Sequence, residues 1–196
     1  GNGPARGICG SGVIDLGARL FLAGMIDIQG KFEPRACGKR LLDQNGVKSL
    51  VIVPADQSAT GEDLLFSQMD LDSLIRSKAA MYAILETITT SVGITLSDLS
   101  AFYVAGTFGC FIDPASAIAL GMLPDLPLDR YQSLGNSSLE GAALALTDSS
   151  ALDAIDTIRD SITYLELNVN ETFMNRFSAA RFLPHTHRQR FPSLKI

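Results

Sequence analysis

The hydrophobic pattern alternates between stretches with helical spacing and short apolar runs. Within residues 71–92 the apolar side chains fall on one stripe, which predicts a long helix lying against a sheet. The run "AFYVA" (101–105) is apolar throughout, as is typical of a strand buried at the centre of a sheet. Helices are predicted at residues 13–23, 71–92, 114–120, 139–146, 152–162 and 171–182, and strands at 47–55, 63–67, 101–105, 130–134 and 163–167.

Capping residues mark several of the predicted helix ends. Ser11 or Gly12 is expected to cap the first helix, and Asp70 the long helix that ends at Gly93. The pair Asp113-Pro114 combines an N-cap residue with proline at the first helical position, and this short helix runs to Gly121.

The alternation of strands and helices predicts an α/β fold with a mixed sheet flanked by helices. Residues 25–68, with two strands around the turn-rich "DQSATGE", are expected to form an antiparallel excursion from that sheet. The 196 residues are predicted to form a single compact unit.

Composition excludes several classes of protein. A hydrophobic content of 46% with 19% charged residues predicts a well-packed chain, and the net charge of -5 offers no general attraction to nucleic acid or anionic membranes. No apolar run approaches the roughly 20 residues of a membrane span, and no signal peptide is recognised. A cytoplasmic protein with neither nucleic acid nor membrane as partner is expected.

The possible metal ligands and reactive groups are sparse. Cys9, Cys37 and Cys110 are widely spaced and form no C-x-x-C pair, which argues against a disulfide framework and a self-contained zinc or iron–sulfur site. His185 and His187 are expected to be exposed on a solvated, basic C-terminal tail.

Glycine-bearing junctions precede three of the predicted helices. Glycine lets the backbone approach a ligand closely, and the free N–H groups at a helix start favour anions. "GICGSG" lacks the Lys-Ser/Thr ending of a P-loop, and "GTFG" lacks the spacing of a dinucleotide-binding motif. The three junctions therefore indicate a nucleotide-like ligand that is bound by neither of these known motifs. The candidate binding residues are Gly7, Gly10, Ser11 and Gly12; Gly106, Thr107, Phe108 and Gly109; and Gly135, Asn136, Ser137 and Ser138.

Five blocks carry a resemblance to a known family. They are "RGICGSGVIDLGARLFLAGMID", "DLDSLIRSKAAMYAILETI", "FYVAGTFGCFIDPASAIALGMLPD", "SLGNSSLEGAALAL" and "ITYLELNVNETFMNRFSAARFLPH". In this order they resemble the C-terminal ATPase region of the reductive activators of corrinoid-dependent enzymes.

The resemblance implies a ribonuclease-H-like fold of the actin and sugar-kinase superfamily. It also implies a multi-domain, metal-binding electron-transfer protein that uses ATP to return cob(II)amide in a corrinoid methyltransfer protein to cob(I)amide. In that picture "FYVAGTFG" receives the adenosine, and "GNSSLEG" and "GICGSG" line the same cleft. The Mg²⁺- and phosphate-binding loops and the [2Fe–2S] ferredoxin-like domain are expected upstream of these residues, since the chain opens without methionine inside a predicted loop.

Several alternatives stay open. The chain could instead be a non-catalytic module that docks a corrinoid protein or a second copy of itself, forming a homodimer. Lys78 could reach a phosphate or be a solvated or snorkelling lysine on the long helix. No catalytic residue is assigned, and the isolated chain is expected to have no ATPase activity.

Overall fold

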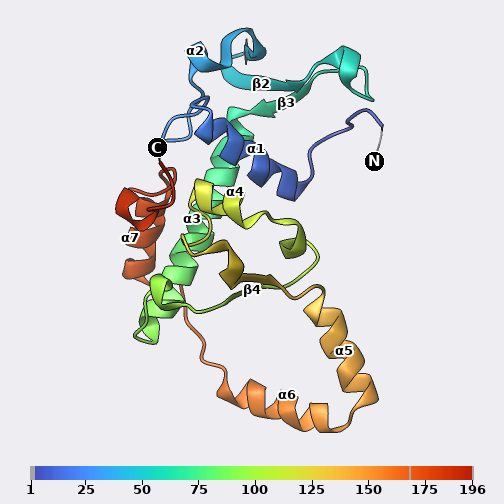
Figure 1. Cartoon of the computed structure of the whole chain (residues 1–196), viewed down its shortest axis with the longest axis vertical. Helices are drawn as coiled ribbons and strands as arrows, with labels where there is room; N and C mark the ends of the chain where they lie inside the picture. The colour runs from blue at the N-terminus through green and yellow to red at the C-terminus, as the bar shows by residue number, and fades with distance from the viewer. Residues whose placement is uncertain (1–2, 168, 196) are drawn as a thin grey trace.

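The computed structural model describes residues 3–167 and 169–195. At one end lies a three-stranded antiparallel sheet in the order β1-β2-β3, and further along the molecule lies a two-stranded parallel sheet, β4-β5 (Figure 1). The strands are β1 (Leu41–Gln44), β2 (Val47–Val53), β3 (Leu64–Ser67), β4 (Phe102–Val104) and β5 (Tyr131–Ser133). The predicted antiparallel excursion is therefore confirmed, with β1 as a strand that the pattern did not indicate.

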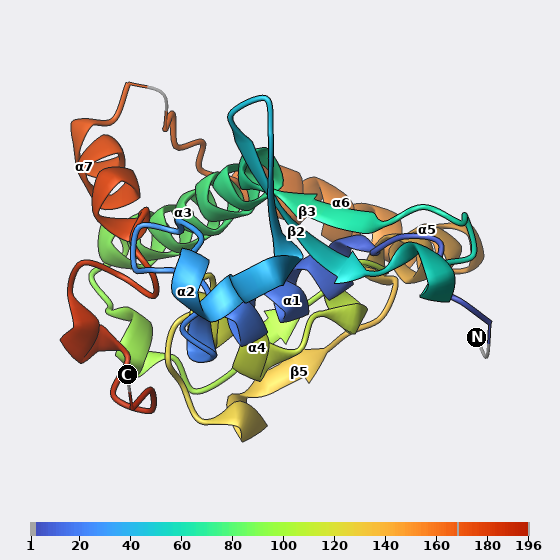
Figure 2. The ribbon, with the colours of Figure 1, turned by 90° about the horizontal axis from the view of Figure 1, so that it is seen from above.

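Helices connect the two sheets. They are α1 (Gly10–Leu22), α2 (Pro34–Cys37), α3 (Gln68–Ser91), α4 (Pro114–Leu120), α5 (Ser137–Thr147), α6 (Ser150–Ser161) and α7 (Glu171–Ala180). Single 3₁₀ turns occur at Gly38–Arg40, Ala55–Gln57, Leu96–Asp98, Gly109–Phe111, Leu128–Arg130 and Arg188–Arg190. Viewed from above, β2 lies over α1, and α3 runs beside it (Figure 2). No helix in the described ranges is long and apolar enough to cross a membrane.

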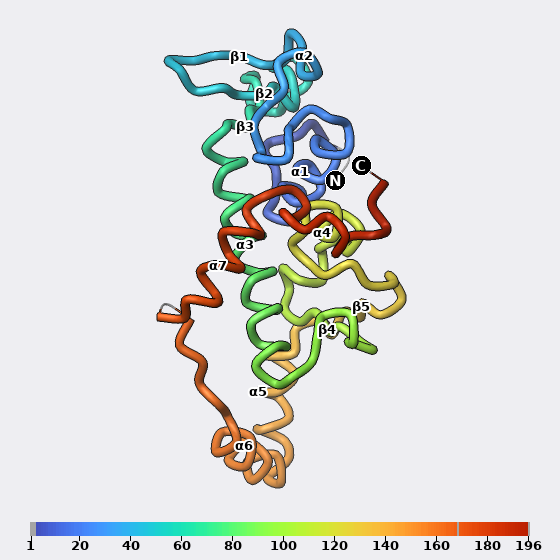
Figure 3. The backbone as a smooth tube through the Cα atoms, turned by 90° about the vertical axis from the view of Figure 1, so that its left-hand side faces the viewer, coloured from blue at the N-terminus to red at the C-terminus, as the bar shows by residue number. Residues whose placement is uncertain are grey.

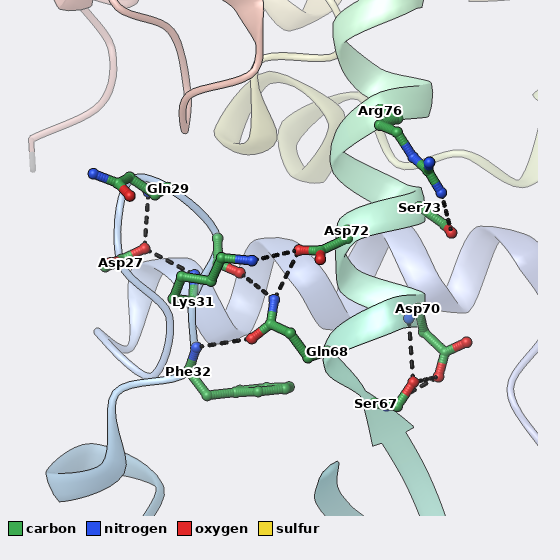
Figure 4. Close-up of polar contacts among 11 residues, drawn as sticks. Asp27, Gln29, Lys31, Phe32, Ser67, Gln68, Asp70, Asp72, Ser73 and Arg76 are labelled. Carbon is green, nitrogen blue, oxygen red and sulfur yellow. Dashed lines mark hydrogen bonds and ion pairs between the residues drawn. The ribbon is translucent and has the colours of Figure 1, made fainter. Parts of the chain in front are cut away.

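The long helix α3 packs against α1, α7, β2 and β3. Its predicted apolar stripe is buried, with Leu71, Leu74, Ile75, Ala79 and Tyr82 all in the core. Its start differs from the prediction: Ser67 is the N-cap, and Asp70 is the third helical residue, whose carboxylate accepts from the Ser67 N–H at 2.9 Å (Figure 4). The two residues form a capping box, which satisfies N–H groups that the first turn leaves without helical partners.

The loop between α1 and α2 is hydrogen-bonded to the start of α3. The side-chain amide nitrogen of Gln68 donates to the Gly30 carbonyl at 2.8 Å and to the Asp72 carboxylate at 2.9 Å (Figure 4). Lys31 forms an ion pair with Asp72 at 2.9 Å. Gly30 has a φ of 72°, and a β-carbon there would lie 1.8 Å from the Ile75 side chain. The close approach of this loop to α3 therefore requires glycine.

One strand prediction is wrong in its position in the sheet, although the strand itself forms as β4, and a second predicted strand does not form. Residues 101–105 were expected at the centre of a sheet, but β4 pairs only with β5 in the described part of the chain, and Tyr103 is 58% exposed. An apolar run does not by itself distinguish a strand covered on both faces from one covered on one face. Residues 163–167 form no strand and connect α6 to α7 in an extended coil.

The C-terminal segment is packed against the core, which corrects the expected solvated tail. Helix α7 lies alongside α3 (Figure 3), and Leu183, His185 and Phe191 are buried. The N–H of Leu183 donates to the Ile28 carbonyl at 2.8 Å, and the N–H of Ser193 donates to Asp125 at 2.7 Å. His187, by contrast, is exposed as predicted.

Candidate nucleotide cleft

A cleft of about 960 Å³ opens between the start of α1, the β3–α3 connection and the end of β4. This volume lies at the upper end of the range of about 300–1,000 Å³ that is usual for small-molecule sites. Its walls are mainly apolar. The lining residues are Gly7, Ile8, Gly10, Val13 and Ile14; Leu64, Leu65 and Phe66; Asp70, Ser73, Leu74, Ser77 and Met81; Val104, Ala105, Gly106, Thr107, Phe108 and Gly109; and Ile112 and Met122.

The structure brings two of the three glycine junctions together in this cleft. Gly7 and Gly10 line one side, and residues 106–109 line another. The two junctions touch, because a β-carbon on Gly10 would lie 2.7 Å from the Phe108 ring. Gly10 thus lets the aromatic ring lie close to the first turn of α1.

Ser11 and Gly12 lie in that first turn and are not among the lining residues. The expected capping by Ser11 or Gly12 is wrong: Cys9 is the N-cap, and its sulfur accepts from the Gly12 N–H at 3.4 Å. Hydrogen bonds from Ser11 and Gly12 lower the pKa of the exposed Cys9 thiol, because they stabilise its thiolate form. The positive end of the α1 dipole faces the same region.

The junction at residues 135–138 lies outside the cleft. Gly106, with a φ of 90°, donates its N–H to the Gly135 carbonyl at 2.8 Å, so the second and third junctions are joined through the backbone. Asn136 caps α5 by accepting from the Leu139 N–H at 3.2 Å. Ser137 and Ser138 form the first turn of that helix. None of these four residues lines the cleft.

Sequence reasoning missed the wall that α3 contributes. Asp70, Ser73, Ser77 and Met81 are spaced three to four residues apart and therefore lie along one edge of the helix. The signal was present in the sequence as two serines interrupting the apolar pattern of a long helix. Their hydroxyls are the polar groups in the cleft that can both donate and accept hydrogen bonds, together with Thr107.

Lys78 points away from the cleft, and both alternatives considered for it are wrong. Its side chain is fully buried, and the nitrogen donates to the carbonyls of Phe182 at 2.5 Å and Pro184 at 2.7 Å. It therefore contributes to the packing of the C-terminal segment, and it neither reaches a phosphate nor lies in solvent.

The described residues do not fit a metal ion. Asp70 is the one carboxylate that lines the cleft, and it is held in the capping box with Ser67. Magnesium sites use one or two carboxylates in near-octahedral geometry with substrate oxygens and water. Among the described residues no group of three or more histidine, cysteine or acidic side chains could hold a metal, and the three cysteines are free.

Comparison with known proteins agrees with this architecture. A family model described as the C-terminal domain of RACo, the ASKHA domain, matches residues 1–195. The corrinoid activation enzyme RamQ of Eubacterium limosum is 30% identical over 184 residues, which cover 90% of this chain and 31% of RamQ. The solved structure of a reductive activator for a corrinoid, iron–sulfur protein superimposes with a TM-score of 0.90 at 38% identity, covering 98% of this chain and 31% of the other.

The chain spans about a third of the length of these relatives. Their similarity extends over almost all of the present residues, through both sheets and the helices that form the cleft. The chain belongs to the family of RACo C-terminal domains, which have the ASKHA fold of actin and the sugar kinases.

Proposed function

We propose that this chain supplies the adenosine side of an ATP site in a reductive activator of corrinoid proteins. The observation that carries the proposal is the meeting of two glycine junctions, at residues 7–10 and 106–109, in one apolar cleft. A flat, apolar base suits such walls, because the glycine backbone allows close approach and the hydroxyls of Ser73, Ser77 and Thr107 offer hydrogen bonds to its edge.

The first turn of α1 supports a position for the phosphates of ATP on the side of the cleft that residues 7–10 line. Ser11 and Gly12 belong to a helix start, where backbone N–H groups and the helix dipole favour an anion. Gly135, Asn136, Ser137 and Ser138 would act indirectly, through the bond that joins Gly135 to Gly106. The ligands of Mg²⁺ would come from outside this chain, since the described residues provide no set that fits.

The wider role follows from the relatives. A similar chain is named as a corrinoid activation enzyme, and another as a reductive activator for a corrinoid, iron–sulfur protein. The proposed protein would couple ATP to the uphill reduction of cob(II)amide to cob(I)amide, with electrons from a [2Fe–2S] domain outside this chain. Its partner would be a corrinoid methyltransfer protein. A non-catalytic docking module of the same family is the alternative.

Binding of a non-hydrolysable ATP analogue to the full-length protein tests the proposal by calorimetry. Ser77→Phe places a ring in the cleft from a helical position without straining the backbone, and it should weaken binding by about tenfold or more. Ser91→Phe is the matched control, on the exposed last turn of the same helix. Cys37→Ala, in the antiparallel excursion, should also leave binding unchanged. Equal affinity of Ser77→Phe and the unchanged protein would remove the cleft from consideration as the nucleotide site.

A further inference from the structure

A second cavity, of about 450 Å³, lies on the C-terminal half of α3. Its volume is ordinary for a site that takes a small molecule, and none of the described residues lines both this cavity and the nucleotide cleft. Its walls come from the end of α3 and the turn after it, from the connection between α4 and β5, and from the C-terminal segment. The lining residues, most of them polar, are Tyr82, Glu86, Thr89 and Thr90; Thr95, Leu96 and Ser97; Pro124, Asp125 and Leu126; and Gln189, Arg190 and Pro192.

The cavity holds two acidic side chains, and only one of them has a cationic partner. Glu86 accepts from Arg190 at 2.7 Å, and Arg176 lies 3.8 Å from its second carboxylate oxygen. Asp125 accepts the backbone N–H of Ser193 at 2.7 Å, and within residues 3–167 and 169–195 it forms no ion pair. A positively charged ligand group would therefore find an uncompensated, half-buried carboxylate here.

Arg190 offers the complementary group. A guanidinium carries five N–H donors in a planar fork, and the bond to Glu86 uses one of the nitrogens. The Arg190 side chain is 37% exposed, so further donors are accessible to a ligand carboxylate. Because Arg176 also lies beside Glu86, that acid would keep a cation if Arg190 turned toward the ligand.

The remaining walls suit a short ligand with an apolar part. The hydroxyl of Thr89 donates to the Leu85 carbonyl at 2.9 Å, and that of Thr90 donates to the Glu86 carbonyl at 2.5 Å. Each hydroxyl oxygen thus keeps lone pairs that accept from an ammonium group. Leu96, Leu126 and the two lining prolines supply apolar contacts for a small aliphatic side chain.

We propose that this cavity binds a small zwitterion of the amino-acid type, with its ammonium group at Asp125 and its carboxylate at Arg190. A phosphate or another simple anion would meet two carboxylates, and a simple cation would leave the donors of Arg190 unused. The ligand would join α3, the connection between α4 and β5, and the C-terminal segment, which are far apart in the sequence. Since it would bind only the folded chain, it should also raise the stability of the protein.

Thermal unfolding of the nucleotide-free, full-length protein tests this site with each standard amino acid in turn. At about a hundred times its dissociation constant, the preferred amino acid should raise the melting temperature by a few degrees. Calorimetric titration then compares that amino acid with its decarboxylated amine and with its deaminated acid. Each single-charge analogue should bind about tenfold or more weakly, because one of the two charged contacts is lost.

Two pairs of variants locate the ligand. Asp125→Asn keeps an oxygen for the Ser193 N–H and should weaken binding of the amino acid by about tenfold or more, whereas Asp129→Asn, in the next exposed turn, should not. Arg190→Lys keeps the charge beside Glu86 but loses the planar fork, so it should weaken binding by a similar factor. Arg188→Lys, in the same 3₁₀ turn and outside the cavity lining, is its control.

Far-UV circular dichroism checks that each variant is folded. The proposal is overturned if no amino acid raises the melting temperature, if the amine alone binds as tightly as the amino acid, or if Asp125→Asn and Arg190→Lys bind like their controls. Affinity for the ATP analogue should be the same in all four variants. Because the amino-acid titrations contain no nucleotide, their failure would leave the nucleotide proposal untouched.

Discussion

The side-chain nitrogen of Lys78 lies 2.7 Å from the carbonyl oxygen of Pro184, and both residues are fully buried. The same nitrogen donates to the Phe182 carbonyl, so one lysine on α3 satisfies two buried backbone acceptors of the C-terminal segment. Burial lowers the pKa of Lys78 to about 7, because the charged form is desolvated. Either form keeps at least two N–H donors for the two carbonyls.

Lys78→Met should therefore destabilise the protein although it keeps the length of the side chain. Two buried carbonyls lose their partner, and we expect the free energy of unfolding to fall by about 2–4 kcal/mol. The control is Lys31→Met, which breaks a half-exposed pair with Asp72 and should cost at most about 1 kcal/mol. Urea denaturation measures both. Equal losses for the two variants would show that the buried bonds add nothing beyond a surface ion pair.

Gly121→Ala tests the packing of the same C-terminal segment, because Gly121 lies against the backbone of Pro184. Gly121 ends α4 with a φ of 72°, and a β-carbon there would lie 1.9 Å from the Pro184 carbonyl oxygen. Gly93 has a nearly equal φ of 77°, but open space surrounds its missing β-carbon. Gly93→Ala should thus cost about 1 kcal/mol for the left-handed backbone alone. Gly121→Ala should cost at least about 2 kcal/mol more, because a backbone must move, and thermal unfolding of the pair would expose the difference.

The sequence pattern predicted the parts of the fold that local signals determine. The stripe of α3, the Asp113-Pro114 start of α4 and the antiparallel strands β2 and β3 are confirmed. Each rests on side-chain periodicity or on a capping residue a few positions away.

The C-terminal segment could not be predicted in this way. Leu183 and Phe191 are buried in a segment whose apolar residues follow no helical or strand period. Lys78, about a hundred positions earlier, binds the carbonyls of the residues on either side of Leu183. Similarly, the glycines at residues 7–10 and 106–109 marked the cleft, whereas the contribution of Ser73 and Ser77 depends on which edge of α3 faces it. Long-range packing decides both questions.

Lowering the pH should destabilise the protein, in part because the buried His185 side chain becomes protonated. This side chain is 3% exposed and packs against Tyr82 and Phe191, its Nδ1 accepts from the His187 N–H at 2.9 Å, and its Nε2 has no hydrogen-bond partner among the described residues. Burial lowers the pKa of His185 to about 4, with smaller effects from Arg190, Lys78 and His187. The folded protein thus favours the neutral imidazole.

The sign of the pH effect follows from this direction. In the unfolded chain a histidine binds its proton near pH 6.5, so the stability that the neutral His185 provides is fully present above that pH and is lost as the pH falls toward 4. The loss should reach about 3 kcal/mol at pH 4. His185→Phe, which keeps a ring in the site, should flatten this part of the stability curve, whereas His187→Asn should not. Chemical denaturation between pH 7 and pH 4 distinguishes the variants.

Substitutions at Gly106 and Gly61 can separate an effect on nucleotide binding from an effect of backbone strain. It has a φ of 90° and lines the cleft, with no atom within 4 Å of the position of a β-carbon. Gly61 has a φ of 72° and equally open surroundings, but it lies in the loop before β3 and does not line the cleft. Valine at either position should therefore strain the backbone by a similar amount, of order 1–3 kcal/mol.

The two variants should differ in nucleotide affinity. In the full-length protein, Gly106→Val should weaken an ATP analogue by about tenfold or more, because the new side chain occupies the space that the ligand would use. Gly61→Val should lower stability by a similar amount and leave affinity unchanged. Asn136→Ala, which removes the cap of α5, should cost about 1 kcal/mol of stability with little effect on binding, since Asn136 does not line the cleft. Calorimetric titration of the folded variants decides. If Gly106→Val binds as tightly as Gly61→Val, the turn at residues 106–109 serves the chain's own folding and the adenosine lies elsewhere.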